Sequence, residues 1–161
     1  GKTTICDELI KAGHRVVPEA SRGAILEAQG RGFSSEEIFA DRKLLANAIW
    51  NRKLEIARGL SPSERCVWDT GLVDSLVFCR LADCDLSRIE PAGRIYRYRS
   101  VALLEPLAHS RIIGDPVRPQ TAHERILLHE SLVEEYGRQK YQATRVGDGS
   151  IGDRLRAVLG A

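Results

Sequence analysis

Four residues at the start of the chain have side chains and a spacing suited to binding phosphate. Gly1-Lys2-Thr3-Thr4 matches the second half of the phosphate-binding P-loop, G-x-x-x-x-G-K-[ST]. In such a loop backbone amides surround the phosphates, the lysine contacts the β and γ oxygens, and the hydroxyl binds Mg²⁺. We therefore expect Gly1 and Lys2 to bind nucleotide phosphates and Thr3 to ligate Mg²⁺. Thr4 either helps to bind the α-phosphate or caps a helix.

The residues that follow this motif predict the helix that a P-loop requires. Ile5, Leu9 and Ile10 have helical spacing, and Gly13 ends the pattern. The alternative is a flexible terminus that contains Gly-Lys-Thr by chance. The chain contains no methionine and so does not begin with an initiator. We therefore expect the first strand and the opening glycines of the loop to precede Gly1.

Two acidic residues follow short apolar segments further along the chain. Val16-Val17 leads to Glu19, and Cys66-Val67-Trp68 leads to Asp69. Open α/β sheets bind their ligands at the carboxyl ends of the strands, so both carboxylates are candidates for phosphoryl-transfer chemistry. Glu19 would accept a proton from an acceptor hydroxyl or hydrogen-bond to it. Asp69 would hold Mg²⁺ through water or serve as the base.

Both acids also have a structural interpretation. Arg22 lies one turn beyond Glu19 and would hold an anionic or polar group of the substrate; alternatively, the two side chains pair with each other in a loop. The structural alternative for Asp69 is that it caps the helix that begins near Gly71, because aspartate favours helix N-caps. Asp74, in that helix, is a weaker acidic candidate.

Short apolar segments alternate with helical patterns along the chain. Ser34 and Glu37 form a capping box that predicts the longest helix, from Ser34 to Gly59, with Lys53 on its polar face. Its expected apolar stripe contains Ile38, Leu44, Leu45, Ala48, Ile49, Ile56 and Leu60. Further strands are expected at 101–104 and 143–146, and further helices after Thr121 and Ser150. Strands that alternate with helices imply parallel crossovers, so we predict an α/β fold, a three-layer αβα sandwich with a parallel sheet.

Composition narrows the function classes. At 161 residues, 43% of them hydrophobic, the chain is predicted to form a single domain over residues 1–161. Its 24 basic and 22 acidic residues give a net charge of +2, which does not favour a nucleic-acid partner. The four cysteines have the spacing of neither a zinc site nor a disulfide framework. No apolar run is long enough to span a membrane and no signal peptide is visible, so we expect a cytoplasmic protein.

Taken in order, these segments resemble the AAA-domain family of small P-loop proteins related to the ribosylnicotinamide kinase part of bacterial NAD regulators. The matching segments are GKTT at 1–4, VVPEASRGAI at 16–25, WDTGLVDSL at 68–76, VALLEPL at 101–107, DPVRPQ at 115–120 and LLHESLVEEYGRQKYQ at 127–142. The resemblance implies a P-loop NTPase fold of the nucleoside-kinase type that binds ATP or GTP with Mg²⁺. By position, it assigns Lys2 and Thr3 to the nucleotide, Glu19 and Arg22 to the acceptor side, Asp69 to the strand-end acid, and Arg118 to a lid over the nucleotide.

The chain departs from this family's pattern at two positions. Members usually have an arginine directly after the strand-end aspartate, where this chain has Thr70. The lid pattern Arg-x-Glu is replaced here by Arg118-Pro119-Gln120, which removes a carboxylate. Neither change touches the residues expected to bind the nucleotide, but both weaken the expectation of full kinase activity.

Two functions follow from these residues. The first is an ATP-dependent, Mg²⁺-dependent kinase that transfers the γ-phosphate to a small hydroxyl-bearing acceptor such as a nucleoside. The second is a nucleotide-binding regulatory module, or slow NTPase, that has no small-molecule acceptor. Thr70 and Gln120 slightly favour the second.

Overall fold

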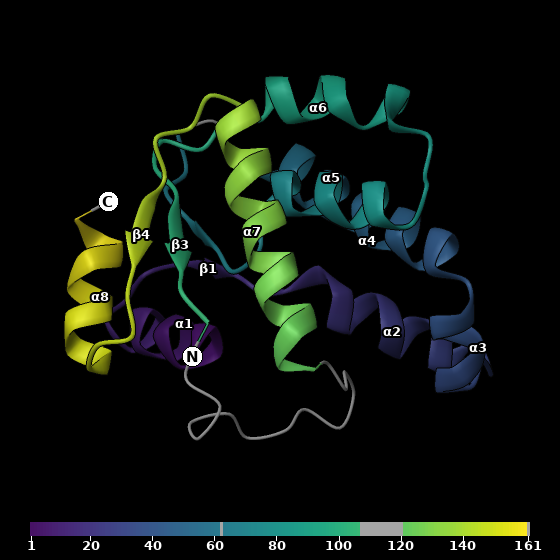
Figure 1. The fold of residues 1–161 in the computed structure, drawn as a ribbon, viewed down its shortest axis with the longest axis horizontal. Coiled ribbons are helices and arrows are strands. Elements are labelled where there is room, and N and C mark those ends of the chain that lie inside the picture. Colours follow the sequence, from purple (N-terminus) through teal and green to yellow (C-terminus); the bar gives the residue numbers. More distant parts are fainter. Residues whose placement is uncertain (62, 107–120, 161) are drawn as a thin grey trace. The chain divides into compact units, whose positions relative to one another are not determined.

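The computed structural model describes residues 1–61, 63–106 and 121–160 (Figure 1). The chain divides into two compact units. Unit 1 contains Gly1–Gly13 and Tyr98–Ala161, and unit 2 contains His14–Arg97. The single domain over residues 1–161 therefore stays a prediction.

Unit 1 contains a pair of parallel strands. β3 (Ala102–Leu104) and β4 (Thr144–Val146) lie side by side, with Leu103 opposite Arg145 (Figure 1). Its helices are α1 (Lys2–Lys11), α7 (Ala122–Arg138) and α8 (Ile151–Leu159). α8 packs against both β4 and α1.

The helix starts of unit 1 follow the predicted caps. Thr121 accepts a hydrogen bond from the backbone N–H of Glu124, and the Glu124 carboxylate accepts one from the backbone N–H of Thr121. This confirms the capping box at α7. The Ser150 hydroxyl accepts a hydrogen bond from the backbone N–H of Asp153, which confirms the predicted cap of α8.

Unit 2 contains a second pair of parallel strands, surrounded by helices. β1 (Val16–Val17) pairs with β2 (Val67–Trp68), and Val17 lies opposite Trp68. Its helical elements are α2 (Ala20–Gly30), α3 (Ser35–Ala40), α4 (Arg42–Gly59), α5 (Leu72–Leu81), the 3₁₀ helix η1 (Leu86–Arg88) and α6 (Glu90–Ile95). The core gathers around α4 and α5 and includes Trp50, Leu72, Leu76, Cys79 and Ile89. Both described strand pairs are parallel, as predicted, whereas the three-layer arrangement stays a prediction.

The prediction of one helix from Ser34 to Gly59 is wrong. The segment forms two helices, α3 and α4, that are separated at Asp41. Asp41 has a non-helical backbone (φ −97°, ψ 77°), and its side chain accepts a hydrogen bond from the N–H of Leu44 at 2.8 Å. Asp41 therefore caps a new helix, while the predicted capping box of Ser34 and Glu37 is confirmed at the start of α3.

The predicted apolar stripe of this segment is also wrong in part. Leu44 is 64% exposed, whereas Lys53, which was expected on the polar face, is only 1% exposed. The other buried residues of α4 are Ala46, Trp50 and Ala57, which lie on the same face as Lys53. α4 packs against both α2 and α5, and this packing determines which face of α4 is buried.

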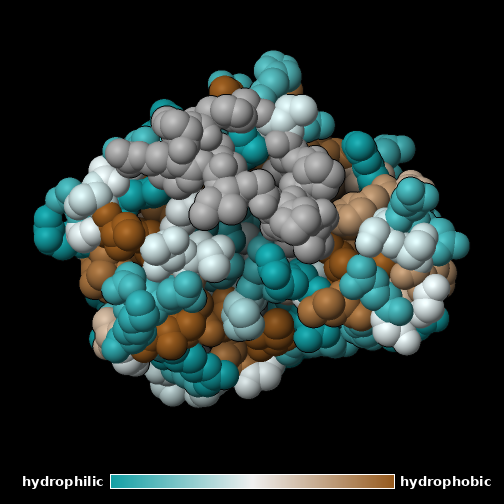
Figure 2. Space-filling view, turned by 90° about the horizontal axis from the view of Figure 1, so that it is seen from below, coloured by the Kyte–Doolittle hydropathy of each residue, from teal (hydrophilic) through white to brown (hydrophobic). Residues whose placement is uncertain are grey.

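Several large apolar side chains stay on the surface. Ile10 was expected on the buried face of the first helix but is exposed, as are Leu26 and Phe33. Figure 2 shows one face of the molecule on which apolar patches are interrupted by hydrophilic side chains. None of the helices in the described part of the chain is long and apolar enough to cross a membrane.

Candidate functional site

The Gly-Lys-Thr-Thr motif forms the start of α1. Gly1 is the N-cap, and Lys2, Thr3 and Thr4 form the first turn, which contains no acidic residue. Thr3 and Thr4 are exposed and Lys2 is half-buried. Exposed first-turn groups and the positive end of the helix dipole favour the binding of an anion, so this geometry suits phosphate.

Positive charge gathers at this end of α1. Burial lowers the pKa of the Gly1 amino group, and the charges of Arg154 and Lys2 lower it further. Asp148 has the opposite and smaller influence. Arg154 and Lys2 therefore contribute positive charge at the start of α1, and Asp148 partly offsets it.

In unit 2 the pair β1–β2 brings two acidic residues to one edge. The N–H of Val67 donates to the carbonyl of Arg15 at 2.8 Å, and the N–H of Asp69 donates to the carbonyl of Val17 at 3.0 Å. Because the strands are parallel, their carboxyl ends lie together; Asp69 directly follows β2, and Glu19 follows β1 after Pro18. The structure therefore brings these two predicted residues to the same strand edge.

The surroundings of Glu19 position its carboxylate. Glu19 is the N-cap residue of α2, but its side chain makes no capping hydrogen bond. Instead, its Oε1 accepts a hydrogen bond from the Ser21 hydroxyl at 2.7 Å. Glu19 is half-buried, and Arg22 is exposed on the first turn of α2. The Glu19 carboxylate is therefore held near the end of β1 by Ser21 and is not used to cap α2.

The turn after Asp69 is held by two buried charged side chains. Lys53 Nζ donates to the carbonyl of Gly71 at 2.7 Å, and the Asp74 carboxylate accepts from the N–H of Gly71 at 2.5 Å. Gly71 is the N-cap of α5, and Asp74 is the acidic residue of a capping box that holds its N–H. Lys53 positions the turn, and sequence reasoning missed it because helical periodicity placed it on a polar face.

A third acidic residue at a strand end lies in unit 1. Glu105 follows β3, and its carboxylate accepts a hydrogen bond from Arg145 Nε at 2.7 Å. His129 Nε2, on α7, lies 3.1 Å from the other carboxylate oxygen, and His129 is 9% exposed. The hydrogen bond from Arg145 holds the pKa of Glu105 below its usual range, with a further contribution from His129. The rule that selected Asp69, an acid directly after a strand, also selects Glu105, but the sequence analysis did not apply it there.

Acid is expected to weaken this cluster. Because the pKa of Glu105 is lower in the folded chain than in the unfolded chain, the carboxylate stabilises the fold above its usual pKa, and that stabilisation is lost as the pH falls through the lowered pKa. Arg145→Gln should therefore lower the free energy of unfolding at neutral pH by up to about 1 kcal/mol, since the pair is partly exposed, and should have little effect at a pH low enough to protonate Glu105 in the folded chain. Urea unfolding at both pH values measures this. In a Glu105→Gln background the same change should have no effect; an equal loss at both pH values contradicts the prediction.

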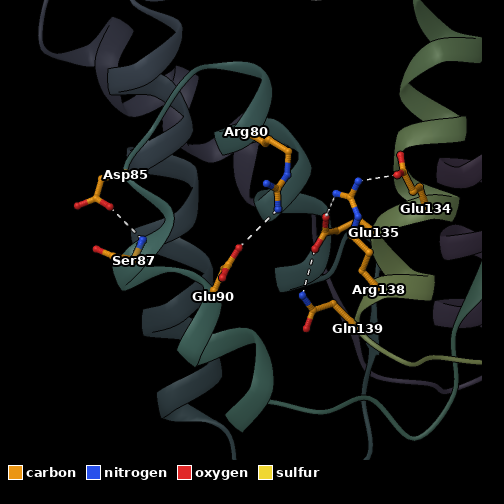
Figure 3. Close-up of polar contacts among 8 residues, drawn as sticks. All are labelled: Arg80, Asp85, Ser87, Glu90, Glu134, Glu135, Arg138 and Gln139. Carbon is orange, nitrogen blue, oxygen red and sulfur yellow. Dashed lines mark hydrogen bonds and ion pairs between the residues drawn. The ribbon is translucent and has the colours of Figure 1, made fainter.

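Other charged groups have structural roles. Arg138 donates to Glu134 at 2.5 Å and to the buried Glu135 at 3.2 Å, and Gln139 donates to Glu135 at 3.0 Å (Figure 3). These bonds satisfy a carboxylate that is buried within unit 1. In unit 2, Arg80 and Glu90 form an exposed pair at 3.5 Å (Figure 3).

The predicted site residues are thus distributed over both units. Lys2, Thr3 and Thr4 belong to unit 1, whereas Glu19, Arg22 and Asp69 belong to unit 2. Arg118, predicted to belong to a lid, lies outside the described residues. Within the described ranges no group of three or more His, Cys, Asp or Glu side chains could hold a metal ion.

Comparison with known families gives one match. The profile of a family described as AAA domain matches residues 1–154. Comparisons with curated proteins and with solved structures gave no significant match. An AAA domain has the α/β fold of a P-loop NTPase and binds nucleotide, in agreement with the start of α1 and with the parallel strand pairs.

Proposed function

The chain belongs to this AAA-domain family, and from that premise we propose that it is a Mg²⁺-dependent kinase that transfers the γ-phosphate of ATP to a small hydroxyl-bearing acceptor, such as a nucleoside. The observation that carries the proposal is the register of β1 and β2, which brings Glu19 and Asp69 to one strand edge. Nucleotide binding alone does not require two carboxylates there. Phosphoryl transfer requires an acid near the acceptor and a second near the metal.

Each residue has a distinct role in this proposal. Lys2 contacts the β and γ phosphates from the first turn of α1, and Glu19 orients the acceptor hydroxyl and accepts its proton. Arg22, exposed beside Glu19, holds a polar or anionic group of the acceptor. Arg118 covers the nucleotide, as the family resemblance implies.

The residues present suit Mg²⁺ rather than a metal that is bound by protein alone. Mg²⁺ keeps several waters and is usually held by one or two protein oxygens together with substrate phosphates. In this proposal Thr3, exposed on the first turn of α1, would offer one such oxygen, and Asp69, directly after β2, would offer another. Bound Mg²⁺ would neutralise charge on the β and γ oxygens of the nucleotide.

Incubation of the full chain with ATP, Mg²⁺ and a panel of nucleosides tests the proposal. We expect a phosphorylated nucleoside whose formation depends on the acceptor. Tight ATP binding without any phosphorylated acceptor would overturn the kinase and favour the second candidate, a regulatory module or slow NTPase. Thr70 and Gln120, where the family resemblance calls for an arginine and a glutamate, favour this second candidate.

A further inference from the structure

Two buried cysteines lie at the end of α5, and the proposed kinase chemistry uses neither of them. Cys79 is 0% exposed and Cys84 is 9% exposed, and both belong to the hydrophobic core of unit 2. The other two cysteines, Cys6 and Cys66, are only half-buried. A free cysteine packs in a core as a small apolar side chain, but two thiols in contact can also be oxidised to a disulfide.

The backbone at the end of α5 forms a Schellman motif that brings these two residues together. Asp83 has a left-handed backbone, with φ 54°, and its N–H donates to the carbonyl of Arg80 at 3.2 Å. The N–H of Cys84 donates to the carbonyl of Cys79 at 2.8 Å. The side chains of the two residues that this second bond joins often touch in such a motif. The way in which the helix ends therefore pairs the two cysteines.

The same backbone bond keeps the two cysteines within reach of a disulfide. A disulfide usually joins Cα atoms that are about 4.4–6.8 Å apart. The covalent path from one Cα to the other through the 2.8 Å hydrogen bond limits their separation to about 7 Å. A disulfide between Cys79 and Cys84 would therefore close around a backbone contact that already exists.

The two thiols have different surroundings. The Cys84 thiol, which keeps some exposure, donates to the carbonyl of Lys43 on α4 at 3.8 Å. The Cys79 thiol hydrogen-bonds to Cys84, and burial, together with the proximity of Cys84, raises the pKa of Cys79 to about 12. Because the thiolate is the form that reacts with an oxidant, Cys79 is protected from direct oxidation. Cys84 is the sulfur that a small oxidant from solvent would meet first.

We propose that Cys79 and Cys84 form a redox modification site, in which a hydroperoxide oxidises Cys84 and Cys79 then closes an intrachain disulfide across the end of α5. In the first step the O–O bond breaks, one oxygen binds the Cys84 sulfur as a sulfenic acid, and the other leaves as water or an alcohol. In the second step the Cys79 sulfur displaces that hydroxyl, which leaves as water with the Cys79 proton. The two thiols are oxidised and the hydroperoxide is reduced.

Peptide mapping of the variant Cys6→Ser/Cys66→Ser, in which only this pair of thiols remains, tests the inference. The folded variant is treated with hydrogen peroxide, alkylated and digested with trypsin without reductant. Arg80 lies between the two cysteines, so cleavage after each arginine puts them in separate peptides, 66–80 and 81–88. We expect these peptides to be linked until dithiothreitol separates them. Unlinked peptides, or a link only between two chains, would overturn the proposal.

Further substitutions in the same variant test the order of the two steps. Cys79→Ala removes the second thiol, so Cys84 should accumulate as a sulfenic acid that dimedone labels. Cys84→Ala removes the first thiol, so Cys79 should stay unoxidised at the same peroxide concentration. Labelling of Cys79 in Cys84→Ala, or no labelling of Cys84 in Cys79→Ala, would contradict the proposal.

The wild-type chain decides the question if these variants fail to fold. Its peptide 66–80 contains both Cys66 and Cys79, and fragment spectra show which of them is bonded to Cys84. A bond to Cys79 supports the inference. A bond to Cys66, or no bond, overturns it.

The Tm separates a disulfide that fits the fold from one that distorts it. Peroxide should raise the Tm of Cys6→Ser/Cys66→Ser by roughly 4–8 °C, because the closed loop restricts the unfolded chain, and dithiothreitol should reverse the change. Addition of Cys79→Ala should abolish this shift. A linked chain with an unchanged or lower Tm would overturn the proposal. No nucleotide enters these measurements, so the inference and the proposed function are tested separately.

Discussion

Lys2→Met should lower the rate of phosphoryl transfer by roughly 10²–10³-fold, the loss typical of removing one preorganised donor from a transition state. Lys2 lies in the first turn of α1, which contains no acidic residue. Its ammonium would meet the β and γ oxygens, where charge builds up during transfer. The measurement is the steady-state rate with ATP and an accepted nucleoside, accompanied by the dissociation constant of ATP.

Lys11 provides the matched control for this change. It lies in the last turn of the same helix, its side chain is 70% exposed, and it pairs with Glu8 at 2.7 Å. Lys11→Met removes the same charge from the same helix and should change the rate by less than about twofold, because exposed pairs contribute little. Equal losses in both variants would show that net charge, and not the position of Lys2, is responsible.

Asp69→Asn should lower kcat by about 10²–10³-fold, the loss typical of removing one preorganised group that stabilises a transition state, while the chain stays folded and still binds ATP. Asp69 follows β2 at the edge that it shares with Glu19, and its backbone is held by the bond to Val17. The amide keeps the shape of the side chain but loses the charge. If Asp69 acts through Mg²⁺, a higher Mg²⁺ concentration should restore part of the rate; if it is the base, it should not.

Asp74→Asn gives the opposite pattern. The Asp74 carboxylate is buried and accepts the N–H of Gly71 at the start of α5, so its replacement should lower the free energy of unfolding by about 1–3 kcal/mol. Urea unfolding of the two variants therefore separates an acid that reacts from an acid that holds a turn. A normal rate in folded Asp69→Asn would refute the assignment.

Local patterns predicted the ends of the elements better than their packing. The capping boxes that begin at Ser34 and Thr121 could be predicted from the sequence because the two residues of each box lie only three positions apart. The break at Asp41 was missed because the residues on both sides of it have helical patterns. The buried face of α4 was misjudged because contacts with α2 and α5, and not the sequence of α4, decide that Lys53 is inside and Leu44 outside.

In the candidate site, too, residues next to a local sequence pattern could be predicted, whereas residues buried by tertiary packing could not. Glu19 and Asp69 were predicted because each lies just after an apolar segment, and the parallel pairing confirms that the two strand ends are neighbours. Lys53, which holds the turn after Asp69, could not be predicted in this way, since its burial depends on how α4 packs against α2 and α5. The roles of all these residues remain predictions until the variants are measured.

The short ladder between β1 and β2 has a mechanical consequence. Only two residues of each strand are paired, and the last bond of the ladder is donated by Asp69 itself. A local opening of this ladder would therefore displace Asp69 and release the strand that leads to Glu19 in one event. Amide hydrogen exchange at Val67 and Asp69 reports on that opening directly. The protection of two backbone amides thus gives a measure, independent of any substrate, of how long both carboxylates stay in place.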